Sequence, residues 1–252
     1  MLKNGIIWTA GLAIALTSGL AAVGAIAQNN APAMALTMKP MNGFAAENLA
    51  VGLIKNFVAE NSGQFPDRVT ASIVALAQKA FVAEPVSPGA VGVLALARGG
   101  NATRKLMENA ALLSRRQPLV TGWMITDSGA HDDVPALLNH YDTLLRTNTS
   151  AAPVVIPVMA RALSNDTFIA PFARLLANQP PWAIEFWAIV VGEPDSLRNA
   201  TRLRERVYNP NENKAAYRDA DLIRALIHDQ QFDLSVSLYR LLIEQTKASN
   251  LV

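Results

Sequence analysis

The sequence predicts an all-α protein in which pairs of helices repeat along the chain. Apolar residues recur with helical spacing over most of its 252 residues, and Pro85, Pro118 and Pro153 separate these stretches at intervals of about 34 residues. Proline suits the first turn of a helix but interrupts a helix interior, so each proline closes one helical stretch and opens the next. The nearest approach to a strand pattern, at 153–157, is flanked by prolines and favours a helix start instead.

The composition excludes several classes of protein. Hydrophobic residues make up 51% of the chain and charged residues 17%, so the chain can bury a core and is not expected to be disordered. Its 22 Lys and Arg nearly balance its 20 Asp and Glu, which leaves no basic surplus for a nucleic-acid partner. The chain has no cysteine, and this excludes disulfides, cysteine-ligated zinc and thiol nucleophiles.

The N-terminus predicts export. Residues 5–27 are uncharged, Lys3 precedes them, and no Lys or Arg follows before Lys39. As a helix, this run would span roughly 34 Å, slightly more than the hydrocarbon core of a membrane. We therefore expect residues 1–30 to be either an uncleaved signal anchor or a signal peptide that is cleaved after Ala27. The positive-inside rule places the body outside the inner membrane in both cases. An uncleaved anchor would hold the body in the periplasm at the inner membrane, and a cleaved protein would be periplasmic or secreted.

The rest of the chain divides into helices at breaks rich in Gly, Pro, Asn and Ser. We expect helix pairs in 31–149, irregular helical repeats in 150–214 and a last helix pair in 215–252. Glycine breaks at Gly99-Gly100 and Ser128-Gly129 separate the helices of two of these pairs, because a turn of this kind needs positive φ. The expected helices lie at 31–38, 89–98, 102–116, 119–127, 132–145, 151–162, 167–177, 182–191, 221–228 and 234–242.

The repeats resemble the tetratricopeptide-repeat family. The segments 39–45, 84–90 and 117–123 are similar to one another, and the clearest helix pair, 221–242, has a small residue, Ser235 or Ser237, in its second helix. The resemblance covers most of 31–165 and 215–247, and it implies an α-solenoid whose first helices line a concave surface for extended peptides or partner proteins. Exported proteins of this kind resemble bacterial envelope scaffolds, including those that accompany polysaccharide synthesis and export.

No pattern in the sequence predicts catalysis. The three histidines, His131, His140 and His228, have no metal-ligand spacing, and the chain has no nucleophile elbow, phosphate loop or dinucleotide-binding motif. The paired carboxylates Asp132-Asp133 and Asp219/Asp221 fall at helix starts, where capping explains them. We therefore expect no catalytic residue, no metal and no cofactor, and a function that is not enzymatic.

Two groups of side chains are candidates for binding a partner. In the last helix pair, Tyr217, Asp221, Arg224 and His228 follow one another at helical spacing and form a polar stripe, while Trp123 and Asp127 could play the same part in the helix 119–127. A third group, Arg198, Arg202 and Arg206, is a candidate site for an anion, and the alternative is a solvated helix face.

Three functions are consistent with these features. The one that we favour is an adaptor that binds envelope proteins, for which the resemblance implies a setting such as polysaccharide synthesis or export. A carbohydrate-binding or carbohydrate-processing protein would instead use the arginines and exposed tryptophans, although Trp123, Trp182 and Trp187 are equally suited to core packing. The third is a structural subunit that associates with itself through an uncovered last helix pair.

Overall fold

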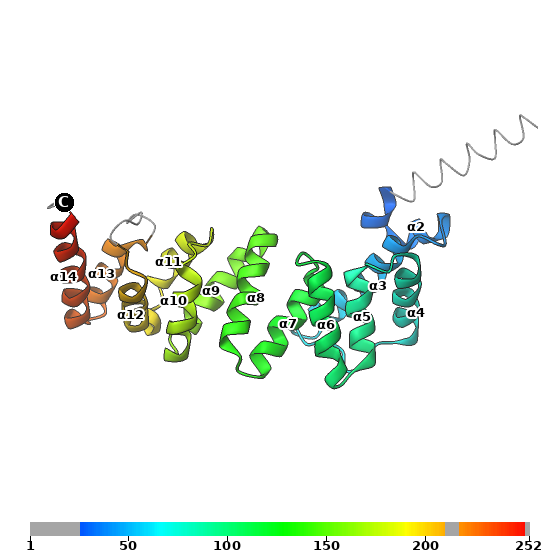
Figure 1. The fold of residues 1–252 in the computed structure, drawn as a ribbon, viewed down its shortest axis with the longest axis horizontal. Coiled ribbons are helices and arrows are strands. Elements are labelled where there is room, and N and C mark those ends of the chain that lie inside the picture. The colour runs from blue at the N-terminus through cyan, green and yellow to red at the C-terminus, as the bar shows by residue number, and fades with distance from the viewer. Residues whose placement is uncertain (1–25, 210–216, 250–252) are drawn as a thin grey trace, which may run out of the picture. The chain divides into compact units, whose positions relative to one another are not determined.

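The structure is a computed structural model that describes residues 26–209 and 217–249 (Figure 1). Every regular element within these two ranges is a helix, which confirms the predicted all-α class. The chain forms two compact units, residues 1–124 and 125–252, and the boundary falls inside helix α7 (Pro118–Ala130). We describe each unit by itself.

The first unit is built from consecutive helices that pack on their neighbours in the chain. Helix α3 packs on α4, α4 on α5 and α5 on α6, while α3 also reaches α5 and is covered by α2. Fully buried alanines, including Ala50, Ala77 and Ala110, lie in the core and let neighbouring helices approach closely. The helices of this unit are α2 (Pro32–Met38), α3 (Gly43–Glu60), α4 (Ala71–Ala83), α5 (Pro88–Arg98) and α6 (Asn101–Leu113), followed by the first half of α7.

A recurrent N-cap explains why 39–45 and 84–90 are similar in sequence. The side chain of Asn42 accepts a hydrogen bond from the Ala45 backbone N–H at 3.0 Å, and Ser87 does the same for Ala90 at 3.2 Å. Each cap satisfies one of the N–H groups that the first turn of a helix leaves without a partner. The similarity between the two segments therefore records the start of the equivalent helices α3 and α5.

A buried carboxylate joins these helix starts. Glu47 of α3 accepts a hydrogen bond from the backbone N–H of Gly89 at 2.7 Å and another from Nε2 of Gln117 at 3.4 Å. The first donor belongs to the opening turn of α5, where the helix dipole also favours a negative charge. Gly89 permits this approach because a Cβ there would lie only 2.4 Å from Oε1 of Glu47.

In the second unit, most of the packing joins every second helix. Helices α8, α10, α12 and α14 contact one another in that order, and α9 contacts α11. The bounds of the α-helices are α8 (Val134–Thr147), α9 (Ala152–Ala162), α10 (Ile169–Leu176), α11 (Ala183–Val190), α12 (Leu197–Val207), α13 (Asp219–His228) and α14 (Phe232–Ser249), and three short 3-10 turns are η1 (Thr149–Ala151), η2 (Asp166–Phe168) and η3 (Pro194–Ser196).

Side chains of α12 and the turn before it terminate α9. Oγ of Ser196 donates to the carbonyl oxygen of Ala160 at 2.8 Å, and Nδ2 of Asn199 donates to the carbonyls of Leu163 and Ser164 at 2.9 and 3.0 Å. The last carbonyls of a helix lack their usual partner within the helix, so these hydrogen bonds add donors at this end of α9, where the carbonyl of Ala160 also accepts from the backbone N–H of Leu163.

Many observed helix bounds follow the expected ones, but α3 and α4 were not among the expected helices, and α14 continues to Ser249, beyond the expected end at 242. The break predicted at Ser128-Gly129 is wrong, because α7 continues through both residues to Ala130 and the chain turns at Asp132, whose φ is 53°. Aspartate is one of the few non-glycine residues that adopt this left-handed conformation readily. The expected membrane span lies outside the described residues except for its last two positions. No helix in the described part of the chain is long and apolar enough to cross a membrane.

Candidate partner-binding surfaces

Three successive turns of the second unit line one pocket of about 260 Å³. The turn from α9 to α10, the turn from α11 to α12 and the turn from α13 to α14 each contribute side chains. We call this site the turn pocket; it is lined by Ser164, Asp166, Pro194, Asp195, Arg198, Asn199, Asp229 and Gln231. Because each turn joins the two helices of a pair, the pocket combines equivalent parts of three consecutive pairs.

Two amide oxygens at this pocket have no donor. Asn199 is only 3% exposed, and its Nδ2 group is committed to the two carbonyls at the end of α9, so Oδ1 is the atom left over. Nε2 of Gln231 donates to Asp229, which leaves Oε1 of Gln231 in the same position. Neither oxygen has a hydrogen-bond partner among the described residues. A buried acceptor without a donor is costly, so a donor group that reached them would be stabilised.

The charge at the turn pocket is negative. Asp166 forms an exposed ion pair with Arg202, with Oδ2 and Nη1 3.1 Å apart. Asp195 and Asp229 form no ion pair with a described residue, and they face one lining cation, Arg198. The carboxylates are not grouped as a metal site, since no cluster of three or more metal-ligating side chains occurs in the described ranges. The pocket therefore favours a hydrogen-bond donor that carries a positive charge.

These surroundings bear on the three arginines that were candidates for an anion site. Arg198, Arg202 and Arg206 are all exposed on α12, as the sequence predicted. However, Arg202 is engaged by Asp166, and Arg198 lies beside Asp195 and Asp229 in the turn pocket. The acidic neighbours oppose an anion at Arg198 and Arg202.

The polar stripe predicted for the last helix pair is incomplete. Asp221, Arg224 and His228 lie on α13, where Asp221 accepts hydrogen bonds from Arg218 and Arg224. The inclusion of Tyr217 is wrong, because this side chain is only 8% exposed and its ring lies 5.8 Å from that of Trp187. The physical reason is that α13 begins at Asp219 and Arg218 has a positive φ of 52°, so helical spacing does not extend back to Tyr217.

Arg204, on the same helix as the three candidate arginines, is a structural residue. Its side chain is fully buried, its Nε atom lies 2.7 Å from Oδ1 of Asp219, and its guanidinium lies 4.1 Å from the ring centroid of Tyr217. The sequence contains a signal for the burial of Arg204. Leu197, Ala200 and Arg204 fall on the apolar face of α12, three and four residues apart, whereas Arg202 and Arg206 do not.

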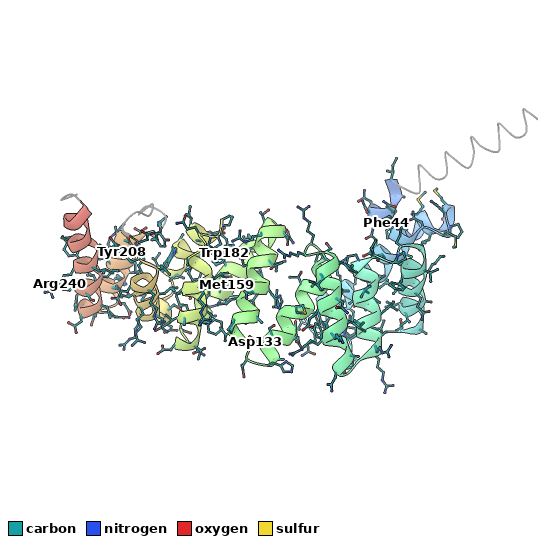
Figure 2. All side chains as sticks on the ribbon, viewed as in Figure 1. Phe44, Asp133, Met159, Trp182, Tyr208 and Arg240 are labelled. Carbon is teal, nitrogen blue, oxygen red and sulfur yellow. The ribbon has the colours of Figure 1, made fainter. Side chains whose placement is uncertain are left out.

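The tryptophans of the second unit belong to its core. Trp187 is fully buried, and its ring lies 5.6 Å from that of Phe186. Trp182, labelled in Figure 2, is also buried, and its Nε1 donates to Oδ1 of Asp142 at 2.8 Å. Core packing, which was the alternative to an exposed binding role, is confirmed for both.

Trp123 and Asp127, the candidate binding pair on α7, are only partly exposed. Trp123 is half-buried and packs against the core of the first unit. Asp127 is also half-buried, and its Oδ1 lies 3.6 Å from Nδ1 of His131.

No protein-family model matches this chain, and no curated protein matches it in sequence. We therefore infer the function from the packing of the helices and from the side chains described above.

Proposed function

We propose that this protein is a non-enzymatic helical-repeat scaffold that binds other proteins, and that the turn pocket holds a lysine or arginine side chain of a partner. The observation that carries this proposal is the convergence of three consecutive turns on one pocket. Repeat proteins build binding surfaces in this way, because equivalent positions of neighbouring repeats come together. The tetratricopeptide-like solenoid and the location outside the inner membrane are part of the same proposal.

The repetition within the second unit supports the solenoid. Three side chains of one helix pair bond to the preceding pair at a constant separation of 36 residues: Ser196 with Ala160, Asn199 with Leu163, and Arg202 with Asp166. The constant separation means that this pair sits in a fixed register on the pair before it. The alternation of contacts, with α10 on α12 and α9 on α11, is typical of stacked helix pairs.

The chemistry of the turn pocket supports a basic ligand. The carboxylates of Asp195 and Asp229 are acceptors in its lining. A guanidinium or ammonium group offers several donors and a positive charge, and it is therefore a suitable partner for them. Arg198 lies at the same pocket on an exposed side chain, so it can turn towards solvent when a second cation enters.

The location is supported by the sequence. The uncharged run at 5–27 after Lys3 favours export of the body, and an envelope partner follows from that location. The carbohydrate-binding alternative loses its main support, because Trp182 and Trp187 are committed to the core and offer no exposed ring for a sugar.

Site-specific photo-crosslinking in the native cells tests the proposal. A photoreactive phenylalanine analogue replaces Arg198 at the turn pocket or, as a matched control, Glu185, which is exposed on α11 away from it. We expect position 198 alone to yield a discrete crosslinked protein, with the attachment mapped by mass spectrometry to a segment that contains Lys or Arg.

The charge requirement is tested in the same strain. The double substitution Asp195→Asn and Asp229→Asn should reduce the crosslink at 198 at least fivefold, whereas Glu193→Gln in the same turn but outside the pocket lining should not. A crosslink that persists unchanged in the double variant, or equal yields at 185 and 198, would refute the proposed site.

A further inference from the structure

The outer face of α14 carries an exposed apolar stripe. Phe232, Val236 and Tyr239 are 56%, 46% and 55% exposed, and their spacing of four and three residues places them on one side of the helix. Leu238, which points away from the stripe, is fully buried, and Ser235, which borders the stripe, is also buried. In Figure 2, Arg240 marks this outer face on the last helix of the second unit.

Charged residues flank the stripe in a regular way. A shallow groove on this face is lined by Phe232, Asp233, Val236, Ser237, Arg240 and Leu241. Asp233 and Arg240 are seven residues apart, so they lie on one side of the helix, at equal distances in sequence from the midpoint between Val236 and Ser237. An acidic residue is thus matched with a basic one across this midpoint.

We propose that α14 binds α14 of a second copy of this chain, antiparallel, about a two-fold axis at that midpoint. In this arrangement Asp233 of each copy faces Arg240 of the other, so the same ion pair forms twice across the interface. A parallel arrangement would place Asp233 against Asp233 and Arg240 against Arg240, and like charges oppose it. The charge pattern of the face therefore selects both the occupant and its orientation.

The size of the surface sets the expected strength. Two helices that meet along one face bury about 1,000 Å² in total, which is the low end for a specific interface. We therefore expect a reversible dimer that dissociates in about the micromolar range rather than an obligate one. This inference does not depend on the proposed scaffold function, because the groove on α14 and the turn pocket share no lining residue.

Charge reversal in sedimentation experiments on the full chain in detergent tests the pairing. We expect the wild-type chain to shift from one to two copies as its concentration rises. Asp233→Arg and Arg240→Asp should each weaken association about tenfold, because each creates two like-charge contacts, and the double variant should restore it to within about threefold. Arg174→Asp, at an exposed position on α10, is the matched control and should change nothing.

This design separates α14 from other routes to association. If the chain associates through residues 5–27, none of these substitutions would change the strength of association. If the groove instead binds a different protein, the double variant would not restore association between copies. A chain that stays monomeric up to about 100 μM, single variants with unchanged association, or a double variant that stays as weak as the single ones would each overturn the inference.

A second measurement does not depend on charge. The chain contains no cysteine, so Val236→Cys introduces a single thiol next to the proposed axis, and Ile184→Cys introduces one at an exposed apolar position on α11. Under mild oxidation the first variant should form a disulfide-linked dimer at least tenfold faster than the second. Equal rates would contradict the proposed contact, and circular dichroism of both variants confirms that the helices are retained.

Discussion

Arg204 and Asp219 form an ion pair that ties α12 to the start of α13. The guanidinium donates from Nε to Oδ1 at 2.7 Å and from Nη2 to Oδ2 at 3.1 Å, and it lies between the rings of Tyr208 and Tyr217. This two-pronged geometry is specific to arginine. The pair lies at the edge of the core of the second unit, close to residue 217, where the second described range begins.

Replacement of Arg204 should therefore be strongly destabilising. We expect Arg204→Met to lower the free energy of unfolding of the second unit by about 3–5 kcal/mol, because it leaves the carboxylate of Asp219 without its buried partner. Arg206→Met, at an exposed position of the same helix, should change it by less than about 0.5 kcal/mol. Urea unfolding followed by tryptophan fluorescence is a suitable measurement, because Trp187 lies 5.8 Å from Tyr217. Equal midpoints for the two variants would contradict the structural role of Arg204.

Two glycines should respond in opposite directions to the same substitution. A Cβ at Gly89 would lie 2.4 Å from Oε1 of Glu47 and 2.8 Å from Cγ2 of Val51, so Gly89→Ala should cost about 1–3 kcal/mol. No described atom outside the helix's own nearby backbone lies within 4 Å of a Cβ at Gly129, which is inside α7, so Gly129→Ala should stabilise by about 0.5–1 kcal/mol. Thermal unfolding of the two variants against the wild type checks both signs. A neutral Gly89→Ala would show that Glu47 can move without loss.

His140 predicts a dependence of stability on pH. Burial lowers the pKa of this imidazole from its usual 6.5, and the nearby charges of Asp133 and Asp127 only partly oppose that shift. The unfolded chain then binds a proton more readily than the folded one, so stability is greatest above about pH 6.5 and falls as the pH drops towards the lowered value. Urea midpoints at pH 7.5 and 5.5 should differ less in His140→Gln than in the wild type. The same difference in both proteins would assign the pH dependence to other groups.

Trp182 should matter for stability through its size more than through its hydrogen bond. Trp182→Phe removes the bond to Asp142 but keeps the ring beside Phe186, and Asp142 retains its ion pair with Arg146, so we expect a loss of about 1 kcal/mol. Trp182→Ala should cost about 3–5 kcal/mol, since it empties a buried site. Chemical unfolding of both variants measures the ratio. Equal losses would mean that the indole N–H, and not the ring, holds α11 to α8.

Local signals in the sequence predicted much of the fold. Helices α5 and α13 begin and end within two residues of their expected bounds, because Pro88, Gly99 and Asp229 act through the backbone of their own neighbourhood. The core role of Trp182 was one of two alternatives that the sequence left open, and its ring lies 5.9 Å from that of Phe186. Such features depend on contacts within one or two turns, which a pattern of residues records directly.

Other features depend on contacts that no local pattern records. Tyr217 was predicted to be exposed because helical spacing was extended through Arg218, whose positive φ interrupts it. The turn pocket depends on Asp166, Asp195 and Asp229, which are far apart in sequence and meet only because the helix pairs stack in register. Arg198 was recognised as a candidate residue, but its acidic neighbours come from other turns and change the ligand that it favours.

The hydrogen bonds from Ser196 and Asn199 make the end of α9 depend on the helix pair that follows it. A fragment that stops after α11 would retain every residue of α9 but lose these donors to its final carbonyls, and water would have to replace them. For this helix pair, truncation from the C-terminal side is therefore expected to weaken the new end first.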